Sequence, residues 1–170
     1  LMLCTDMGTE PADFILSSRD KVIFVHVKCG DSPIAPQSSA GALCLVGGQA
    51  LKNLHFLLNS SPSRYGNITN IRGAWPAPSG NKHKICLDSR IRLFNKTFDL
   101  THSLDDVIET IDKRRQDPLV RKEIWLVIGN AFSHNHFMSQ LNSPSTANSE
   151  TVQAYQLLET WFSQTSSHDV

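Results

Sequence analysis

The sequence predicts an α/β fold, in which β-strands form a central sheet and helices flank it. Short β-branched and apolar segments crowd the first 28 residues, apolar side chains recur at helical spacing over residues 40–59, and a strand-like segment at 123–129 lies among further helical segments. The chain has 170 residues, which suits one compact domain with a substantial core and is short for two. We therefore expect a single domain over residues 1–170.

Three strands are expected at the start of the chain. An apolar run over residues 1–5 ends at Asp6, a second run covers residues 12–16, and a polar turn at 17–21 leads into residues 22–28. The third segment is rich in β-branched and aromatic side chains and is the strongest strand signal in the sequence. The short connections between the segments predict antiparallel hairpins.

A long helix is expected over residues 40–59. Apolar side chains recur there at helical spacing, namely Leu43, Val46, Ala50, Leu54 and Leu57. Ser38 or Ser39 is a candidate N-cap. Gly47 and Gly48 inside the helix cost roughly 1–2 kcal/mol against alanine, which indicates close packing or close ligand approach at that turn.

The remainder of the chain alternates between loops and regular elements. Residues 60–82 are rich in Ser, Pro, Gly and Asn and are expected to form a flexible insertion, in which Trp75 could stack on a base. Residues 84–98 are expected to form one or two strands, and Ser103 to cap a helix that runs to about Arg115. A buried strand at 123–129 and helices near 133–141 and 149–164 follow, with Trp125 and Trp161 expected in the core.

Composition excludes several classes of protein. Sixteen basic and sixteen acidic residues cancel, so nucleic acid must be contacted through local patches or by another part of a larger protein. The four cysteines lack the spacing of a zinc site, and Cys4 and Cys44 within apolar runs are expected to be buried thiols of a reducing cytoplasm. Neither a signal peptide nor an 18-residue apolar stretch is present, so we expect a cytoplasmic protein with no membrane partner. Because the chain opens on a strand without Met, we expect an excised or C-terminal domain of a longer protein.

Residues of the first two hairpins point to metal chemistry. With a two-residue period, Phe24, His26 and Lys28 share one face of their strand. Asp13 lies in the preceding apolar run, and a buried acid is costly unless it is paired or bound to a metal. With Glu10 and Asp6 close by in sequence, we expect these residues to hold a hard cation such as Mg²⁺, and Lys28 to position the attacking water or stabilise developing negative charge.

The same residues resemble the PD-(D/E)XK nucleases, the restriction-endonuclease-like superfamily. Asp13 followed by His26-Val27-Lys28 is similar to the family pattern of an Asp on one strand and a D/E-X-K on its hairpin partner. The resemblance implies a mixed central sheet flanked by helices, with catalytic roles for Asp13, Glu10, His26 and Lys28. His26 departs from the family's acid and makes Mn²⁺ more plausible than Mg²⁺ as the bound ion.

The helix after these strands supplies a second match. Family members carry a Gln and a basic residue near the metal, and here Gln49, Lys52 and Asn53 share a polar helix face. Gln49 is expected to be catalytic, and Lys52 and Asn53 to bind nucleic acid. The segments DMGTEPADF, HVK and GQALKN also resemble nuclease domains appended to helicase-like proteins of bacterial antiviral defence, over roughly residues 1–59. The resemblance implies a metal-dependent endonuclease acting on DNA, or on RNA, with helicase-like partner domains.

Other interpretations compete with this one. A catalytically degenerate nuclease fold could serve as a nucleic-acid-binding or assembly module, and an unrelated α/β enzyme could use the Asp and His for acid–base work. Asp13 could simply pair with Arg19 or Lys21. The two histidines of His134-Asn135-His136 are more often solvated than metal-bound, and basic residues at 113–115 and 121–122 fit either a helix-terminal charge run or contact with a nucleic-acid backbone.

Overall fold

A computed structural model describes residues 1–6, 10–30, 33, 37–38, 40–59, 68–73, 90–93 and 103–170. These residues form two compact units. The first unit contains the described residues of Leu1–Val25 and Asn53–Glu123, and the second contains those of His26–Lys52 and Ile124–Val170. Strands β3 (Lys21–Lys28) and β5 (Arg121–Ile128) and helix α1 (Ala40–Leu58) contribute residues to both units.

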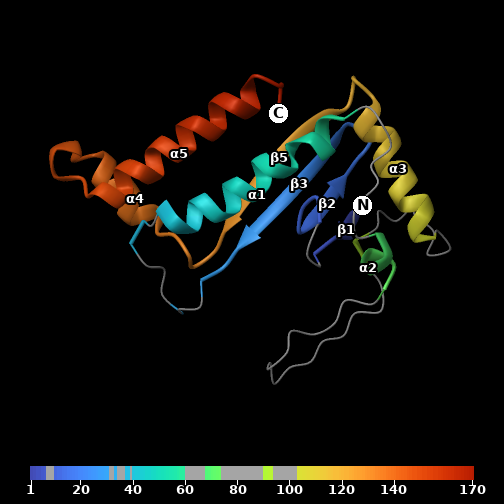
Figure 1. Cartoon of the computed structure of the whole chain (residues 1–170), viewed down its shortest axis with the longest axis horizontal. Coiled ribbons are helices and arrows are strands. Elements are labelled where there is room, and N and C mark those ends of the chain that lie inside the picture. Colours follow the sequence, from blue (N-terminus) through green and yellow to red (C-terminus); the bar gives the residue numbers. More distant parts are fainter. Residues whose placement is uncertain are drawn as a thin grey trace. The chain divides into compact units, whose positions relative to one another are not determined.

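An antiparallel run of three strands lies at the centre of the first unit, as the sequence predicts (Figure 1). Strand β1 (Met2–Cys4) pairs with β2 (Phe14–Ser17), and β2 pairs with β3 in a register that runs from Phe14 opposite Val25 to Ser17 opposite Val22. Strand β4 (Ile91–Leu93) pairs antiparallel with β1 on its other side. The five strands follow the order β4-β1-β2-β3-β5.

Strand β5 runs beside β3 in the same direction. The amide of Arg121 donates to the oxygen of Asp20 over 3.0 Å where both strands begin, and the amide of Gly129 donates to the oxygen of Lys28 over 2.9 Å where both end. The sheet is therefore mixed, and a parallel pair of this kind needs a crossover connection, of which α1 is the first helix. The predicted α/β fold with a mixed sheet and flanking helices is confirmed.

Helix α3 (Leu104–Gln116) of the first unit begins where the sequence predicts. The hydroxyl of Ser103 accepts from the amide of Asp106, whose carboxylate accepts from the amide of Ser103, so both members of a capping box are present. Val107, Ile111 and Arg115 recur every four residues and are the buried residues of the helix. An amphipathic helix of this kind is held by its packed face.

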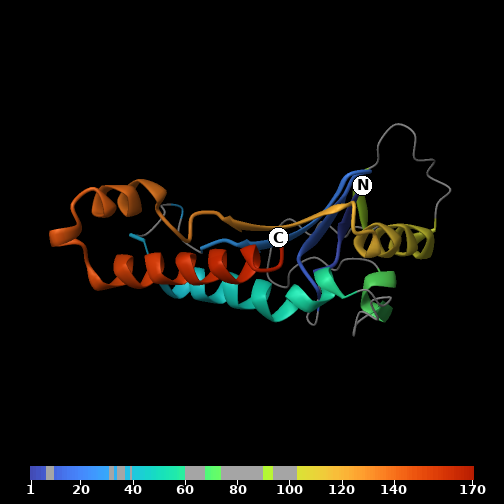
Figure 2. The same ribbon diagram turned by 90° about the horizontal axis from the view of Figure 1, so that it is seen from above.

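Two helices cover one face of β3 and β5 in the second unit, namely α1 and α5 (Ser149–Ser166) (Figure 2). Its core contains Ala40, Leu43, Phe137, Ala154 and Trp161, with Leu126 and Ile128 of β5 packed against them. Helix α4 (His134–Leu141), capped by Ser133, and a short 3₁₀ helix at Pro144–Thr146 precede α5. The helices predicted at 133–141 and 149–164, and the burial predicted for Trp161, are confirmed.

The glycine pair inside α1 has one tightly packed member. A methyl group on Gly47 would lie 2.0 Å from Cζ2 of Trp161, whereas one on Gly48 would meet nothing within 4 Å. Close packing or close ligand approach was predicted for this turn, and close packing occurs at Gly47. The missing side chain lets the α5 indole rest directly on the α1 backbone.

Two sequence predictions, the flexible insertion and the strand region that follows it, are narrowed by the fold. Helix α2 (Ile68–Arg72) lies inside the predicted flexible insertion, anchored by the buried side chain of Ile71. Residues 60–67 and 74–82 of that insertion, with Trp75, lie outside the described residues. Of the predicted strand region 84–98, residues 90–93 are described and contain β4; residues 84–89 and 94–98 lie outside the described part. At the start of α1 the Glu150 carboxylate accepts from the Ala40 amide over 3.1 Å, and Ser39, one of the two predicted caps, lies outside the described residues.

Two burial predictions were wrong. Trp125 is 46% exposed, because Leu126 and Ile128 face the core and strand alternation turns Trp125 to the opposite face. Cys44 is exposed, because the buried side of α1 is formed by Leu43 and Val46, on either side of it. The burial predicted for Cys4 is confirmed.

No helix among the described residues combines the length and the apolar character that crossing a bilayer requires.

Candidate metal centre

The turn between β1 and β2 brings two carboxylates together. Cys4 and Phe14 are the last paired residues of the two strands, so Asp6 follows the end of β1 and Asp13 precedes the start of β2. The Asp13 backbone oxygen accepts from the Thr5 amide over 2.9 Å and from the Asp6 amide over 3.2 Å. These bonds extend the antiparallel pairing past the strand ends, and Glu10 lies in the connection between them.

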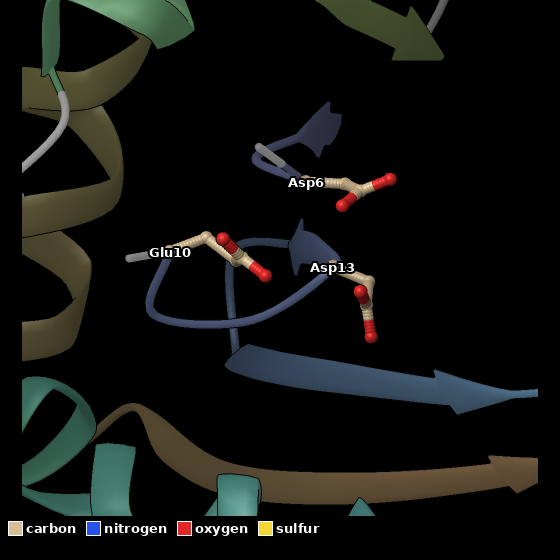
Figure 3. A group of neighbouring side chains, drawn as sticks. All are labelled: Asp6, Glu10 and Asp13. Carbon is tan, nitrogen blue, oxygen red and sulfur yellow. The ribbon is translucent and has the colours of Figure 1, made fainter. Parts of the chain in front are cut away.

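Asp6, Glu10 and Asp13 form a group of three half-buried carboxylates (Figure 3). One carboxylate oxygen from each residue lies within 4.8 Å of the corresponding atoms of the other two. Three oxygen donors without nitrogen or sulfur are the set that hard divalent cations such as Mg²⁺ and Mn²⁺ take, with water in the other coordination positions. The three acidic metal ligands predicted from the sequence therefore lie together in the first unit.

Polar contacts to the backbone hold this turn in place. Nη1 of Arg90 donates to the backbone oxygen of Asp6 over 2.8 Å, and Nδ2 of Asn53 donates to the backbone oxygen of Glu10 over 2.9 Å. The amide of Asp13 donates to the oxygen of Val25 over 3.0 Å, which ties the third acid to β3. Each acidic residue is thus anchored through its backbone.

Arg90 is the residue of this site that sequence reasoning missed. It is 3% exposed, and its Nε donates to the backbone oxygen of Gly73 over 3.1 Å. Its amino-acid type and its place before a short strand do not distinguish it from a solvent-exposed arginine. A buried guanidinium needs several acceptors, and here backbone oxygens from distant segments supply them.

His26 and Lys28 belong to the second unit and lie on the same face of β3, at two-residue spacing. His26 is 2% exposed, and within the described part of the chain its Nε2 has no hydrogen-bond partner. Burial lowers the pKa of His26 to about 4, so the imidazole is neutral at pH 7. A neutral imidazole nitrogen is the form that binds a metal. Lys28 is exposed at the end of the strand.

The three residues predicted to act from the helix differ in their surroundings. Gln49 and Lys52 are exposed on α1, whereas Asn53 is half-buried and uses its amide to hold Glu10. Gln49 and Lys52 are accessible to a ligand. Asn53 has a partner within the protein, a role the sequence did not predict.

No protein-family model matches this chain, and neither does any curated protein or solved structure. The function is therefore inferred from the residues of the chain itself.

The basic residues that could have met nucleic acid have partners inside the protein. Lys113 pairs with Glu109 and Arg121 with Glu123, Arg114 donates to the hydroxyl of Ser17, and Lys122 donates to the backbone oxygen of Asp117. Arg115 is buried and bonds to Asp112 and to the backbone of Asn59. These contacts favour the structural interpretation of the two basic segments.

Lys21, which the sequence offered as a possible partner for Asp13, pairs with Glu123 over 3.0 Å.

Of the two histidines in His134-Asn135-His136, His136 has a structural role. Nδ1 of His136 accepts from the amide of Ser38 over 3.1 Å and lies 2.8 Å from the Ser38 hydroxyl, which in turn contacts the hydroxyl of Thr151 over 2.8 Å. His134 is exposed at the start of α4. A ring nitrogen that already accepts a backbone N–H is engaged, so this segment does not favour a second metal centre.

Proposed function

We propose that this chain is a metal-dependent nuclease domain of the restriction-endonuclease-like type that hydrolyses phosphodiester bonds of DNA. The observation that carries the proposal is the group of three carboxylates, Asp6, Glu10 and Asp13, with donor oxygens within 4.8 Å of one another. Its donor chemistry suits Mg²⁺ or Mn²⁺, the ions that phosphodiester hydrolysis uses. RNA is the other substrate of the same bond chemistry.

The order of the strands supports the same proposal. Asp13 immediately precedes β2, and His26-Val27-Lys28 ends β3, the antiparallel partner of β2. Helix α1 then begins the crossover to a parallel strand, so the sheet is mixed. A mixed sheet with an acid before one strand and a lysine at the end of its antiparallel partner is consistent with the resemblance to PD-(D/E)XK nucleases.

The residues take the following roles in the proposed reaction. Asp6, Glu10 and Asp13 hold the divalent ion, which when bound supplies Lewis-acid activation of water and offsets charge on the phosphate. Lys28 keeps the role that the sequence predicts, positioning the attacking water or stabilising the developing negative charge. His26 is a candidate nitrogen ligand, and Gln49 and Lys52 are candidate contacts to the scissile phosphate. Helicase-like domains are the partners that the resemblance implies.

Two measurements on the same proteins test the proposal. Calorimetric titration with Mn²⁺ is expected to show binding by the wild type that Asp13→Ala abolishes. Cleavage of single- and double-stranded DNA and of RNA is expected to need Mn²⁺ or Mg²⁺ and to be lost in both Asp13→Ala and Lys28→Ala, with Lys28→Ala still binding the ion. Glu109→Gln is the matched control, because it removes an acid of an exposed helix pair in the same unit.

Together the two measurements distinguish an active nuclease from a catalytically degenerate nuclease fold. A wild type that binds Mn²⁺ through Asp13 but cleaves no nucleic acid would favour the catalytically degenerate fold, for which the His in place of an acid at position 26 is the supporting feature. A wild type that neither binds Mn²⁺ nor cleaves any substrate would overturn the proposed function.

A further inference from the structure

The second unit contains an apolar cavity of about 220 Å³ that the proposed metal chemistry does not use. Helix α1 lines it with Ala50 and Leu51, β5 with Leu126, and α5 with Leu158 and Trp161. None of its lining residues carries a charged side chain, and among the described residues of the lining Thr165 supplies the only hydroxyl. A phosphate, a nucleotide or a carboxylate would find no counter-charge in these walls.

The two helices cannot close this cavity by moving together. At Gly47 the indole of Trp161 already rests on the α1 backbone, so closely that a methyl group there would lie 2.0 Å from the ring. Trp161 therefore acts as a spacer that sets how near α5 can approach α1. Protein interiors relax only partly around a cavity, and this contact prevents the most direct relaxation.

Water inside this cavity finds few polar partners. A buried water needs two to four polar partners, and the Thr165 hydroxyl already donates to the backbone oxygen of Trp161 over 2.9 Å. An apolar cavity of about 150 Å³ lined by aliphatic and aromatic side chains stays dry and binds benzene. The cavity in this chain has the same kind of wall but is partly open to solvent, so an apolar ligand would displace water that the walls hold weakly.

We propose that this cavity is a binding site for a small, uncharged, apolar molecule of about the size of a single or fused aromatic ring. The volume sets the size, the side chains of the lining carry no charge that would hold an anion, and the Trp161 ring forms part of the wall. Phe162 also lines the site and is 73% exposed, so the cavity has an aromatic residue at its boundary with solvent. The site needs neither the metal nor nucleic acid.

The test uses benzene and indole as probes, with benzoate as the charged counterpart, and metal-free protein. Binding is expected to shift the methyl resonances of Leu51, Leu126 and Leu158 saturably in NMR spectra, and to leave those of the exposed Leu45 and Leu141 unchanged. Benzoate is expected to bind at least tenfold more weakly than benzene. Ala50→Leu should fill the cavity and abolish binding, whereas Cys44→Leu, an exposed position of the same helix outside the cavity, should retain it.

Several outcomes would overturn the inference. These are the absence of saturable shifts in the wild type, equal affinity for benzoate and benzene, and unchanged binding in Ala50→Leu. Ala50→Met adds nearly the same volume with a more flexible side chain and serves as the filling variant if Ala50→Leu does not fold. Because no ion or nucleic acid is present, failure here leaves the proposed nuclease function unaffected, and failure of that function leaves this result unaffected.

Discussion

The guanidinium of Arg90 donates a hydrogen bond to the backbone oxygen of Asp6 over 2.8 Å, from a side chain that is almost fully buried. The same side chain reaches the backbone of Gly73, and the Arg90 backbone oxygen accepts from the Cys4 amide over 2.8 Å. Arg90, just before β4, is thus hydrogen-bonded to β1 and to the segment after α2. It also holds the backbone of Asp6, whose carboxylate is a candidate metal ligand. Arg90 positions Asp6 and does not itself offer a ligand.

Replacing Arg90 by methionine should therefore weaken metal binding as well as stability. The backbone oxygens of Asp6 and Gly73 would lose their partner, at a cost of about 2–3 kcal/mol in the free energy of unfolding. We expect at least a tenfold weaker affinity for Mn²⁺ by calorimetry. Arg115→Met is the control, since Arg115 is equally buried in the same unit but bonds to Asn59 and Asp112; it should lose stability with no change in Mn²⁺ affinity. Equal loss of affinity in both variants would contradict a specific role for Arg90.

Asn53 is expected to act on the metal centre through Glu10. Asn53→Ala removes a hydrogen bond of 2.9 Å to the Glu10 backbone, which should cost about 1 kcal/mol of stability and weaken Mn²⁺ binding. Titration without nucleic acid separates this role from the predicted nucleic-acid contact, which would leave the Mn²⁺ affinity unchanged. Gln49→Ala, at an exposed position of the same helix, should leave both stability and metal affinity near the wild-type values.

The two neighbouring glycines of α1 should respond in opposite ways to the same substitution. Gly47→Ala forces a methyl group into the Trp161 ring and should lower the free energy of unfolding by about 1–3 kcal/mol. Gly48→Ala has open space around it and should raise stability by up to about 1 kcal/mol, because alanine is the better helix former. Urea denaturation measures both effects. If Gly48→Ala were as destabilising as Gly47→Ala, the close packing of Trp161 on Gly47 would not be the cause.

Protonation of His26 should destabilise the fold in mildly acidic solution. Burial lowers the pKa of this imidazole to about 4, against about 6.5 in the unfolded chain. Between these values the unfolded state binds more protons than the folded state, so the stability contribution present above pH 6.5 is lost as pH falls to about 4. The loss amounts to about 3 kcal/mol.

A variant without the imidazole isolates this contribution. His26→Leu should show a flatter dependence of the unfolding free energy on pH between 6.5 and 4 than the wild type. His168→Gln, at an exposed position near the end of the chain, should follow the wild-type curve. Parallel curves for wild type and His26→Leu would mean that His26 is not held neutral by burial.

Much of the secondary structure could be predicted from the sequence, because the signals are local. Alternation and β-branching marked the three strands of the first unit, and the Ser103-Asp106 capping box marked the start of α3. Composition predicted the structure less well where it depends on the burial or orientation of a single apolar side chain. The buried side chain of Ile71 anchors a short helix within a segment rich in loop-forming residues. Trp125 faces away from the core because side chains alternate between the two faces of β5.

By itself the sequence determined the chemical types at the candidate site and their order along the chain, with acids around the first hairpin and His26-Val27-Lys28 at the end of the third strand. Only the tertiary structure decided that Asp6, Glu10 and Asp13 come within reach of one ion. It alone also assigned Arg90 and Asn53 to their backbone partners and seated Trp161 on Gly47. The physical reason is that periodicity and capping depend on neighbours in the chain, whereas these contacts join residues that are close only after the strands and helices have packed.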